Sequence, residues 1–399
     1  MVLDFKLIYL KNISISKIIV FSFIFFSLFL VGRNIFAETV VKTEPVGQLV
    51  HRLFNITGAP SAKSVVITND NKEIWATLLM NKKRGVSIFS AEDGKKITDI
   101  NLDGGGGVEI VFSTDGTKAY VSQMETARVF EIDVKTKNIL RVFKTKSSWT
   151  KVLELSPDGS KLYASNWLGN NISEFDLVSG KLLQNIKTVK TPRGTYITKD
   201  GQYIYVAGYD KGEIQKINLI DNTRKIIFKS GGAMRHFAVD EARGILYISD
   251  MGKNVIWKLT LNDDKVVQFA KTDSHPNTIA LSPDKKVLFV SCRGHNFSST
   301  NYYVPGPDWG SVILFDTTNA KMLDAIVAGN QPTALDVSED GSLLIFSDFL
   351  DAKIEVFKVP SYEELLKGNG GRSAVYKKEL IKIVKKKLVI NQKLVKKKV

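Results

Sequence analysis

The strongest constraint on the fold of this chain is a sequence repeat with a period of about 42 residues. The stretch "LELSPDGSKLYASN" (153–166) has six counterparts, each with a polar turn followed by an apolar and aromatic run. The seven positions equivalent to Ser156 are Thr68, Ser113, Ser156, Thr198, Asp240, Ser282 and Ser338, at steps of 45, 43, 42, 42, 42 and 56 residues. Self-similarity at such a period is typical of repeat architectures, in which each copy forms one structural unit.

Each copy predicts four short strands. In the third copy, an apolar run leads into an Asp-Gly turn, which suits a tight antiparallel hairpin because glycine tolerates positive φ. "KLYASN" is the second strand, "NISEFDLVSG" alternates apolar and polar residues as the third, and "KLLQNIKTV" is the fourth. Four strands in about 40–45 residues, without helical periodicity, are typical of a β-propeller blade and exclude an α/β fold. We therefore predict an all-β fold, a single seven-bladed β-propeller.

The two ends of the repeat region indicate how the ring closes. The seventh copy stops after its third strand, "AKIEVFKV" (352–359). Before the first copy lies "GQLVHRLFNITGAP" (47–60), which matches "GKLLQNIKTVKTP" (180–192), a fourth strand followed by the proline that opens the next blade. We expect this N-terminal strand to complete the last blade, because closing the ring removes an exposed sheet edge.

The runs "LYASN", "IYVAG", "LYISD", "LFVSC" and "AYVSQ" resemble the signature strand of the YVTN-repeat β-propeller family. The "SPDG" turns match this family too, and the resemblance covers residues 47–359. It implies a seven-bladed propeller of an exported or surface bacterial protein. Related seven-bladed propellers include lactonases, so the resemblance leaves a hydrolase open.

Residues 1–37 have the pattern of a secretory signal peptide. Three lysines precede a 14-residue apolar run at 18–31, shorter than the roughly 20 residues that span a bilayer. Ala37 offers a small residue at the cleavage site, and an uncleaved anchor is the alternative. We expect export to the periplasm or the cell surface, with the propeller at 38–360 and a basic tail, helical or disordered, at 361–399.

The net charge of +15 comes mostly from the ends of the chain. Residues 371–399 contain eleven Lys or Arg and one Glu, whereas residues 38–370 carry only +2. A nucleic-acid-binding propeller would carry its charge on the folded body, so we expect no nucleic-acid partner. The basic tail could contact an anionic surface, or be solvated. Cys292 is the only cysteine, so no internal disulfide holds the fold and we expect a buried thiol.

A cluster of cations is predicted at one mouth of the central channel, which the innermost strands line. The first rim positions are Lys63, Val108, Lys151, Arg193, Arg235, Asn277 and Thr333, and the second are Ser64, Glu109, Val152, Gly194, His236, Thr278 and Ala334. Converging cations favour an anionic ligand, and arginine binds carboxylate or phosphate in bidentate fashion. The alternative is that these cations pair with Glu109 or reach solvent. Our candidates for ligand binding are Lys63, Lys151, Arg193, Arg235, His236 and Asn277.

A 14-residue insertion between the second and third strands of copy six supplies a second group of candidates. This loop, within "HNFSSTNYYVPGPDWGS" (295–311), opens on the same face as the channel mouth. Aromatic residues beside Arg and His form a plausible wall for a sugar, an aromatic acid or a peptide. The alternative is a loop that packs on itself and stabilises the fold. The candidates here are His295, Tyr302, Tyr303, Asp308 and Trp309.

Other chemistry has little support in the sequence. With one cysteine and four histidines there is no Cys–His metal spacing, and we predict no metal, cofactor or catalytic group. Two metal sites are weaker alternatives, one with His236 and His295 as ligands and one with Glu109, Asp250 and Asn277. The leading hypothesis is an exported, non-enzymatic propeller that binds a small anionic ligand or a protein through one face. The alternatives are a hydrolase or lactonase at the channel mouth, and a surface adhesin.

Overall fold

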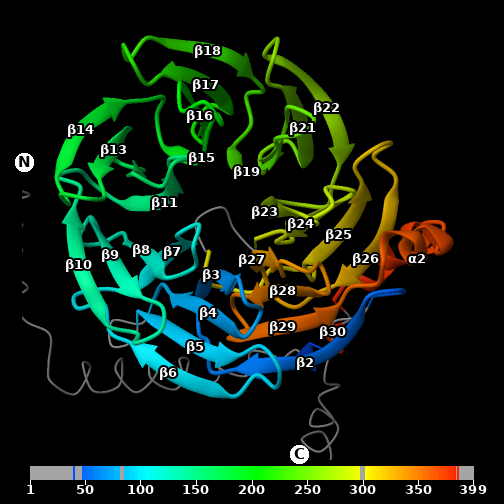
Figure 1. Cartoon of the computed structure of the whole chain (residues 1–399). Helices are drawn as coiled ribbons and strands as arrows, with labels where there is room; N and C mark the ends of the chain where they lie inside the picture. Colours follow the sequence, from blue (N-terminus) through cyan, green and yellow to red (C-terminus); the bar gives the residue numbers. More distant parts are fainter. Residues whose placement is uncertain (1–38, 41–46, 81–84, 297–301, 383, 386–399) are drawn as a thin grey trace, which may run out of the picture. The chain divides into compact units, whose positions relative to one another are not determined.

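The computed structural model describes residues 39–40, 47–80, 85–296, 302–382 and 384–385. Seven four-stranded antiparallel sheets are arranged in a ring around a central channel, so the predicted seven-bladed β-propeller is confirmed (Figure 1). The expected signal peptide at 1–37 lies outside the described residues. Among the residues that the structure describes, no helix is long and apolar enough to cross a membrane.

The first four blades follow the repeat in order, each running from its innermost to its outermost strand. Blade one contains β3 (Ala62–Ile67), β4 (Glu73–Leu78), β5 (Val86–Ser90) and β6 (Lys96–Ile100). Blade two contains β7 (Gly107–Phe112), β8 (Lys118–Gln123), β9 (Arg128–Asp133) and β10 (Ile139–Lys144). Blade three contains β11 (Thr150–Leu155), β12 (Lys161–Asn166), β13 (Asn171–Asp176) and β14 (Leu182–Lys187). Blade four contains β15 (Pro192–Ile197), β16 (Tyr203–Gly208), β17 (Glu213–Asn218) and β18 (Arg224–Lys229).

The last three blades include the one that joins the two ends of the chain. Blade five contains β19 (Met234–Asp240), β20 (Ile245–Asp250), β21 (Val255–Thr260) and β22 (Lys265–Lys271). Blade six contains β23 (Pro276–Leu281), β24 (Val287–Cys292), β25 (Ser311–Asp316) and β26 (Met322–Val327). Blade seven contains β27 (Pro332–Val337), β28 (Leu343–Asp348), β29 (Lys353–Lys358) and β2 (His51–Thr57). The insertion of copy six therefore lies between β24 and β25.

The "SPDG" turns are held by a hydroxyl–carboxylate pair. Ser156 donates its Oγ–H to Asp158 Oδ1 (2.5 Å) and accepts the backbone N–H of Lys161 (2.9 Å). Gly159 has a φ of 68°, a left-handed value that favours glycine. The Ser or Thr that defines the repeat forms the same bond in five other blades, while Asp240 of blade five instead pairs with Arg243.

A buried hydroxyl in the second strand shapes the channel wall. Each innermost strand shifts register after its first residue, as between Met234 and Phe237 in β19. Ser249 of β20 accepts the backbone N–H of His236 in this irregular stretch (3.1 Å) and donates to the carbonyl oxygen of Asn277 in the next blade (2.7 Å). Equivalent hydroxyls occur in all blades except blade four, where Ala207 stands at this position. The signature strand therefore orients the side chains that face the channel.

Apolar side chains fill each of the seven interfaces between neighbouring blades. Phe346 and Phe357 are fully buried and stack at a centroid distance of 5.6 Å in the cluster shared by blades six and seven. Each fully buried side chain of this size stabilises the fold by about 1.5–3 kcal/mol. Without any disulfide, these interfaces hold the ring together; Cys292 is itself buried and burial raises the pKa of its thiol.

Blade seven is closed by the N-terminal strand, as expected from the sequence. β2 pairs with β29 in an antiparallel register from His51 with Lys358 to Thr57 with Lys353. Asp324 of β26 fixes the approach to this strand, because its carboxylate accepts the backbone N–H groups of residues 48–50 at 2.8–3.2 Å.

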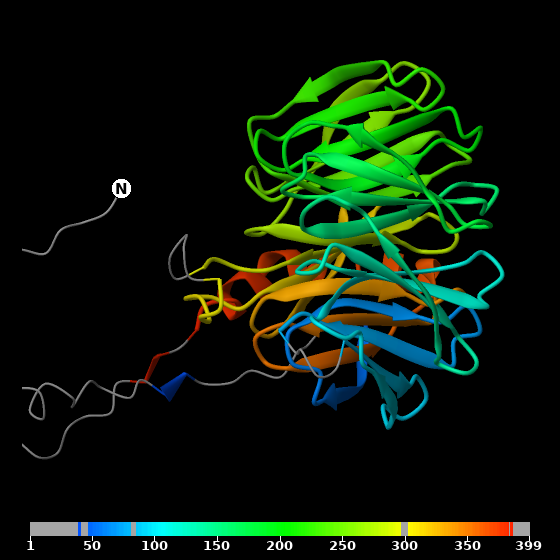
Figure 2. The same cartoon turned by 90° about the vertical axis from the view of Figure 1, so that its left-hand side faces the viewer.

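The segment after β29 packs against blade six. It contains α2 (Tyr362–Lys367), the 3-10 helix η1 (Gly371–Ala374) and α3 (Tyr376–Glu379), which all contact β26. Figure 2 shows the last part of this segment (red) beside the insertion (yellow). α2 lies at the other end of blade six, where Tyr362 Oη donates a hydrogen bond to Asp316 Oδ2 (3.1 Å). A separate small unit is described only by β1 (Thr39–Val40) and β30 (Val384–Lys385), which pair antiparallel; residues 386–399 lie outside the described part.

Candidate functional site

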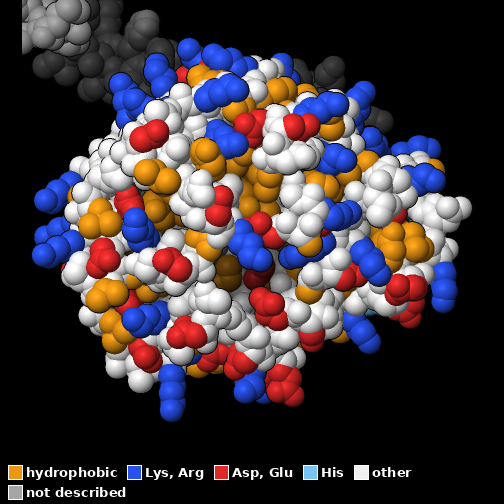
Figure 3. All heavy atoms as spheres, turned by 45° about the horizontal axis from the view of Figure 1, so that its top comes forward, with side chains coloured by type: hydrophobic (Ala, Val, Ile, Leu, Met, Phe, Trp, Pro, Cys, Tyr) orange, Lys and Arg blue, Asp and Glu red, His pale blue; other side chains and the backbone are white. Residues whose placement is uncertain are grey.

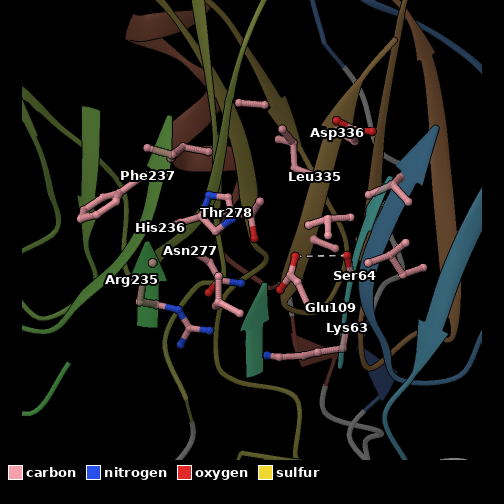
Figure 4. A pocket seen from close by; sticks show the side chains of 18 of the residues that line it. Lys63, Ser64, Glu109, Arg235, His236, Phe237, Asn277, Thr278, Leu335 and Asp336 are labelled. Carbon is pink, nitrogen blue, oxygen red and sulfur yellow. Dashed lines mark hydrogen bonds between the residues drawn. The ribbon is translucent and has the colours of Figure 1, made fainter. Parts of the chain in front are cut away.

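The central channel contains a cavity of about 260 Å³, and the described residues that line it all belong to the seven innermost strands. Figure 4 shows Lys63 and Arg235 at one end of this cavity, Asp336 toward the other, and Glu109 and His236 between them. The candidates of the first rim position are the second residues of the innermost strands, not residues of the preceding loops. On the outer surface, Lys or Arg side chains and Asp or Glu side chains are interspersed over the face in Figure 3, so this face does not carry charge of one sign.

Five cationic side chains converge at the end that we call the cationic mouth: Lys63, Lys151, Arg193, Arg235 and Arg293. Arg193 and Arg235 are each 7% exposed and Arg293 is 4% exposed. Within the described part of the chain, the buried Arg193 Nη1 has no hydrogen-bond partner, and Arg235 Nη1 contacts Met251 Sδ (3.6 Å). Among the described residues, none of the five forms an ion pair. The three arginines have therefore lost water without gaining a carboxylate partner in the described part of the chain.

Burial and mutual repulsion disfavour the charged state of these groups. Burial, with the neighbouring charges of Arg193 and Lys63, lowers the pKa of Lys151 to about 5. Burial lowers the pKa of Lys63 well below its ordinary value, and the surrounding arginines lower it further. Burial and the charges of Arg193 and Arg293 lower the pKa of Arg235 to about 9. An anion in the mouth would reverse these shifts, because opposite charge favours the protonated forms.

Aromatic rings form a collar around the cations. Trp167 lies beside Lys151, whose Nζ is 3.9 Å from the ring centroid, and beside Arg193, whose Cζ is 5.5 Å away. Arg293 Cζ lies 4.1 Å from the ring centroid of Tyr302. Such contacts partly replace water around a desolvated cation.

Trp167 comes directly after the second strand of its blade, and the repeat places a counterpart there in every blade, whereas Tyr302 belongs to the insertion. These positions are Leu79, Met124, Trp167, Tyr209, Met251, Arg293 and Phe349. In six blades the backbone N–H of this residue binds a carbonyl oxygen just before the innermost strand, as Trp167 N–H does with Trp149 (2.9 Å). Arg293, Trp167 and Tyr209 were not among the sequence candidates. Extending the repeat alignment by one residue past "LYASN" would have revealed them.

Glu109 and His236 lie deeper in the cavity. Burial raises the pKa of Glu109 to about 7, although Arg193 and Lys63 act in the opposite direction. Its carboxylate accepts a hydrogen bond from Ser64 Oγ (3.4 Å). Burial and the charges of Arg193 and Arg235 lower the pKa of His236 to about 4, so its ring is neutral at pH 7. His236 Nδ1 is buried without a hydrogen-bond partner in the described part of the chain.

The opposite end of the cavity is acidic. Burial, with the charge of Glu241, raises the pKa of Glu154 to about 8. Burial raises the pKa of Asp336 to about 7, although its carboxylate accepts the backbone N–H of Ile67 (2.8 Å). Basic side chains therefore lie at one end of the channel and carboxyl groups at the other, so a ligand with one anionic end has a preferred orientation.

The insertion divides into parts with different surroundings. Tyr302 reaches the cationic mouth, where its hydroxyl oxygen accepts a hydrogen bond from Lys63 Nζ (3.1 Å). Tyr303 packs edge-on against Tyr302 but is 53% exposed. His295 pairs with Asp308, Nδ1 to Oδ2 at 2.8 Å. Trp309 is 3% exposed and packs against blade six and the C-terminal segment, so it does not line the cavity.

The geometry offers little to a metal ion. Asp250 is engaged by the N–H of Ala233 (2.8 Å) and by Ser230 Oγ (2.6 Å), and Asn277 Nδ2 donates to the carbonyl oxygen of Thr333 (2.5 Å). Within the described ranges, no group of three His, Cys, Asp or Glu side chains is placed to hold a metal. Neither set of residues considered from the sequence forms a metal centre there.

Comparisons with known proteins place the chain among seven-bladed propellers. The family described as "Lactonase, 7-bladed beta-propeller" matches residues 65–230. The chain is 34% identical over 261 residues to Antigen Lp49 of Leptospira interrogans, covering 63% of this chain and 57% of that protein. It is 22% identical over 207 residues to 6-phosphogluconolactonase of Enterobacter, covering 48% of this chain and 56% of that protein. The chain thus spans less than two thirds of the length of either relative.

Among solved structures, hydrazine synthase of Kuenenia stuttgartiensis is similar in fold. The TM-score is 0.64 at 14% sequence identity, with 76% of this chain and 97% of the other covered. At this identity the likeness shows the propeller fold alone.

Proposed function

We propose that this propeller binds a small polyanion, carrying carboxylate or phosphate groups, in the cationic mouth. The observation that carries the proposal is Arg193 Nη1, a buried charged donor without a partner among the described residues. A bidentate anion would satisfy this donor and neutralise the charge on Arg235 at the same time. Trp167 and Tyr302 would pack against the ligand's carbon skeleton.

The experiment is isothermal titration calorimetry of the full chain with 6-phosphogluconate, citrate and inorganic phosphate, and with glucose as a neutral reference. We expect binding of the polyanions that weakens with salt, and no binding of glucose. Arg193→Ala should weaken binding at least about 10-fold, because a hydrogen bond to a charged group contributes about 1.5–3 kcal/mol. Arg224→Ala, an arginine on the outer strand β18, is the matched control. Equal affinities for the Arg193 variant and the parent protein would refute the proposal.

Export and a position at the cell surface are part of the same proposal. They are supported by the signal-peptide pattern of residues 1–37, by the resemblance to YVTN-repeat propellers, and by the similarity to a protein named an antigen. Protease treatment of intact cells should remove the propeller if it is surface-exposed. Protection in intact cells, with digestion after the envelope is opened, would assign it to an internal compartment instead.

Lactone hydrolysis at the mouth is the second candidate. Two observations favour it: the family match over residues 65–230, and Glu109, a buried carboxyl whose pKa of about 7 suits a general acid or base. The test is hydrolysis of 6-phosphogluconolactone by the parent protein and by Glu109→Gln. Turnover that the substitution abolishes would support the hydrolase, and binding without turnover would support the binding protein.

A further inference from the structure

We propose that Ser274, His295 and Asp308 form a serine-nucleophile site at the rim of the propeller, outside the central cavity. Ser274 Oγ lies 2.8 Å from His295 Nε2, and His295 Nδ1 lies 2.8 Å from Asp308 Oδ2. A serine, an imidazole and a carboxylate joined in this order are the arrangement that activates a serine hydroxyl.

The carboxylate of Asp308 fixes the tautomer of the imidazole. Its Oδ1 accepts the backbone N–H of His295 (2.8 Å), while its Oδ2 faces the ring. A carboxylate can only accept, so in the neutral imidazole Nδ1 carries the proton and Nε2 is left with a lone pair toward Ser274. Thus His295 can take the hydroxyl proton of Ser274 as a general base.

The segment that carries Ser274 is held on both sides. Before it, Asp273 accepts hydrogen bonds from Ser311 Oγ (2.6 Å) and Tyr376 Oη (3.2 Å). After it, the backbone N–H of His275 binds Asn254 Oδ1 (2.9 Å). The serine is therefore fixed by neighbours that take no part in its own bond to His295.

The loop that carries the other two residues is equally constrained. The backbone N–H of Gly294 binds the carbonyl oxygen of Ser274 (3.1 Å), which ties the insertion to the serine segment. Gly294 has a φ of 75°, and a Cβ there would lie 3.2 Å from Asp308 Oδ1. The neighbouring Trp309 donates its backbone N–H to the carbonyl oxygen of Leu380 (2.8 Å), so the C-terminal segment holds the end of the loop that carries Asp308. Such support from outside the three residues is what a pre-organised site requires.

The site is open to substrate and adjoins the cationic mouth. The side chain of His295 is 59% exposed, and Ser274 is partly exposed. Hydrogen bonds link the insertion to the mouth, because Gln331 accepts from Arg293 Nη2 and donates from Nε2 to Asn296 Oδ1 (3.3 Å), next to His295. The substrate class is therefore an ester or lactone that also carries a carboxylate or phosphate; this part of the inference rests on the proposed function.

The reaction would be ester hydrolysis through an acyl-enzyme. Ser274 Oγ bonds to the carbonyl carbon, and its proton passes to His295 Nε2. The bond from carbon to the leaving oxygen breaks, and that oxygen takes the proton from His295. Water then attacks the acyl carbon while His295 accepts one proton, and Ser274 recovers its hydrogen as the carboxylic acid leaves. One ester and one water give one acid and one alcohol, so no other reactant is needed.

The test is labelling of the full chain with a biotinylated fluorophosphonate, located by mass spectrometry of the peptide 272–285. We expect modification at Ser274, none in Ser274→Ala, and labelling at least about 100-fold slower in His295→Gln, since that is the size of a general-base contribution. Ser160→Ala, which removes a serine paired with an aspartate but with no histidine, should label as the parent does. Thermal melting of each variant shows that it is folded. A folded parent whose Ser274 is unlabelled, or a His295 variant that labels at the parent rate, would overturn the inference.

A second measurement separates this inference from the proposed function. Hydrolysis of mono-4-nitrophenyl succinate is compared with that of 4-nitrophenyl acetate, and we expect kcat/KM to favour the anionic ester at least about 10-fold at low salt. If Ser274 is labelled but the anionic ester is not preferred, the assignment of Ser274 as the nucleophile stands and the anionic substrate class is rejected. Polyanion binding without any labelling of Ser274 would leave the proposed function standing and reject this site.

Discussion

Lys63 and Tyr302 are 239 residues apart in the chain, yet Lys63 Nζ donates a hydrogen bond to the hydroxyl oxygen of Tyr302 over 3.1 Å. The bond joins the innermost strand of blade one to the insertion of blade six. It brings the most irregular part of the sequence to the mouth of the regular ring. The aromatic ring of Tyr302 also lies against Arg293, so Tyr302 orients two of the five basic side chains of the mouth.

Replacing Tyr302 by Phe should weaken polyanion binding about 5-fold. The substitution removes the acceptor for Lys63 but keeps the ring, and a net hydrogen bond contributes about 1 kcal/mol. Tyr203→Phe is a suitable control, because Tyr203 also faces a lysine (Lys216 Nζ, 4.6 Å from the ring centroid) but lies outside the mouth. Unchanged affinity in calorimetry of the Tyr302 variant would show that its hydroxyl does not orient Lys63 for the ligand.

Binding of a polyanion should take up protons. In the free protein the pKa of Lys151 is about 5, so this side chain is neutral at pH 7, and a bound anion raises that pKa. The affinity should therefore fall as the pH rises above about 5. Calorimetry at one pH in two buffers of different ionisation enthalpy measures the uptake directly. Proton release, or an affinity independent of pH between 6 and 9, would contradict the electrostatic account of the mouth.

Replacing Lys151 by Met should stabilise the ligand-free protein. The pKa of Lys151 is about 5 in the folded state and near 10.5 when unfolded, so the unfolded state binds more protons between these values. The parent's stability should therefore rise with pH across this window, and the substitution should flatten the rise. At pH 7 we expect the midpoint of thermal unfolding to increase by at least about 2 °C. A lower midpoint would mean that the buried amine is stabilised by a partner.

The fold could be predicted from the sequence because a propeller repeats its local chemistry. The turn Ser or Thr recurs in six blades, the Asp-Gly pair in four and the aromatic second strand in all seven, and each depends on interactions between neighbouring residues or strands. Ring closure could also be predicted, because residues 47–60 resemble the fourth strand that the seventh sequence copy lacks.

The candidate site could be predicted only in part. Lys63, Lys151, Arg193 and Arg235 are found by alignment, because they occupy one position of the repeat. The contacts of the insertion cannot be found by alignment, because nothing in "HNFSSTNYYVPGPDWGS" indicates which aromatic side chain will face the mouth. Tyr302 does so while Trp309 packs against the C-terminal segment, because that segment covers the outer strand of blade six. Such packing depends on chain that is distant in sequence.

Replacing Ser249 by Ala should loosen the wall of the cavity. Its hydroxyl bonds the backbone of His236 and that of Asn277 in the next blade, so the substitution leaves one buried N–H unpaired. We expect a loss of about 1–2 kcal/mol in the free energy of unfolding, measured with urea, and weaker polyanion binding. Ser160→Ala, on an exposed turn, should change neither. If the Ser249 variant unfolds at the parent's urea concentration, the hydroxyl does not contribute to the wall.

Replacing Asp324 by Ala should weaken the closure of the ring. This carboxylate accepts the N–H groups of residues 48–50, and its loss leaves those donors without a partner next to the strand that completes blade seven. Removing the charged acceptor should cost about 2–3 kcal/mol, measured by urea unfolding. Asp210→Ala, on an exposed turn of blade four, should stay within about 0.5 kcal/mol of the parent. Limited proteolysis should cut the Asp324 variant first near residues 47–57, because β2 would detach from β29. Equal stability with cleavage elsewhere would show that the strand pairing alone closes the ring.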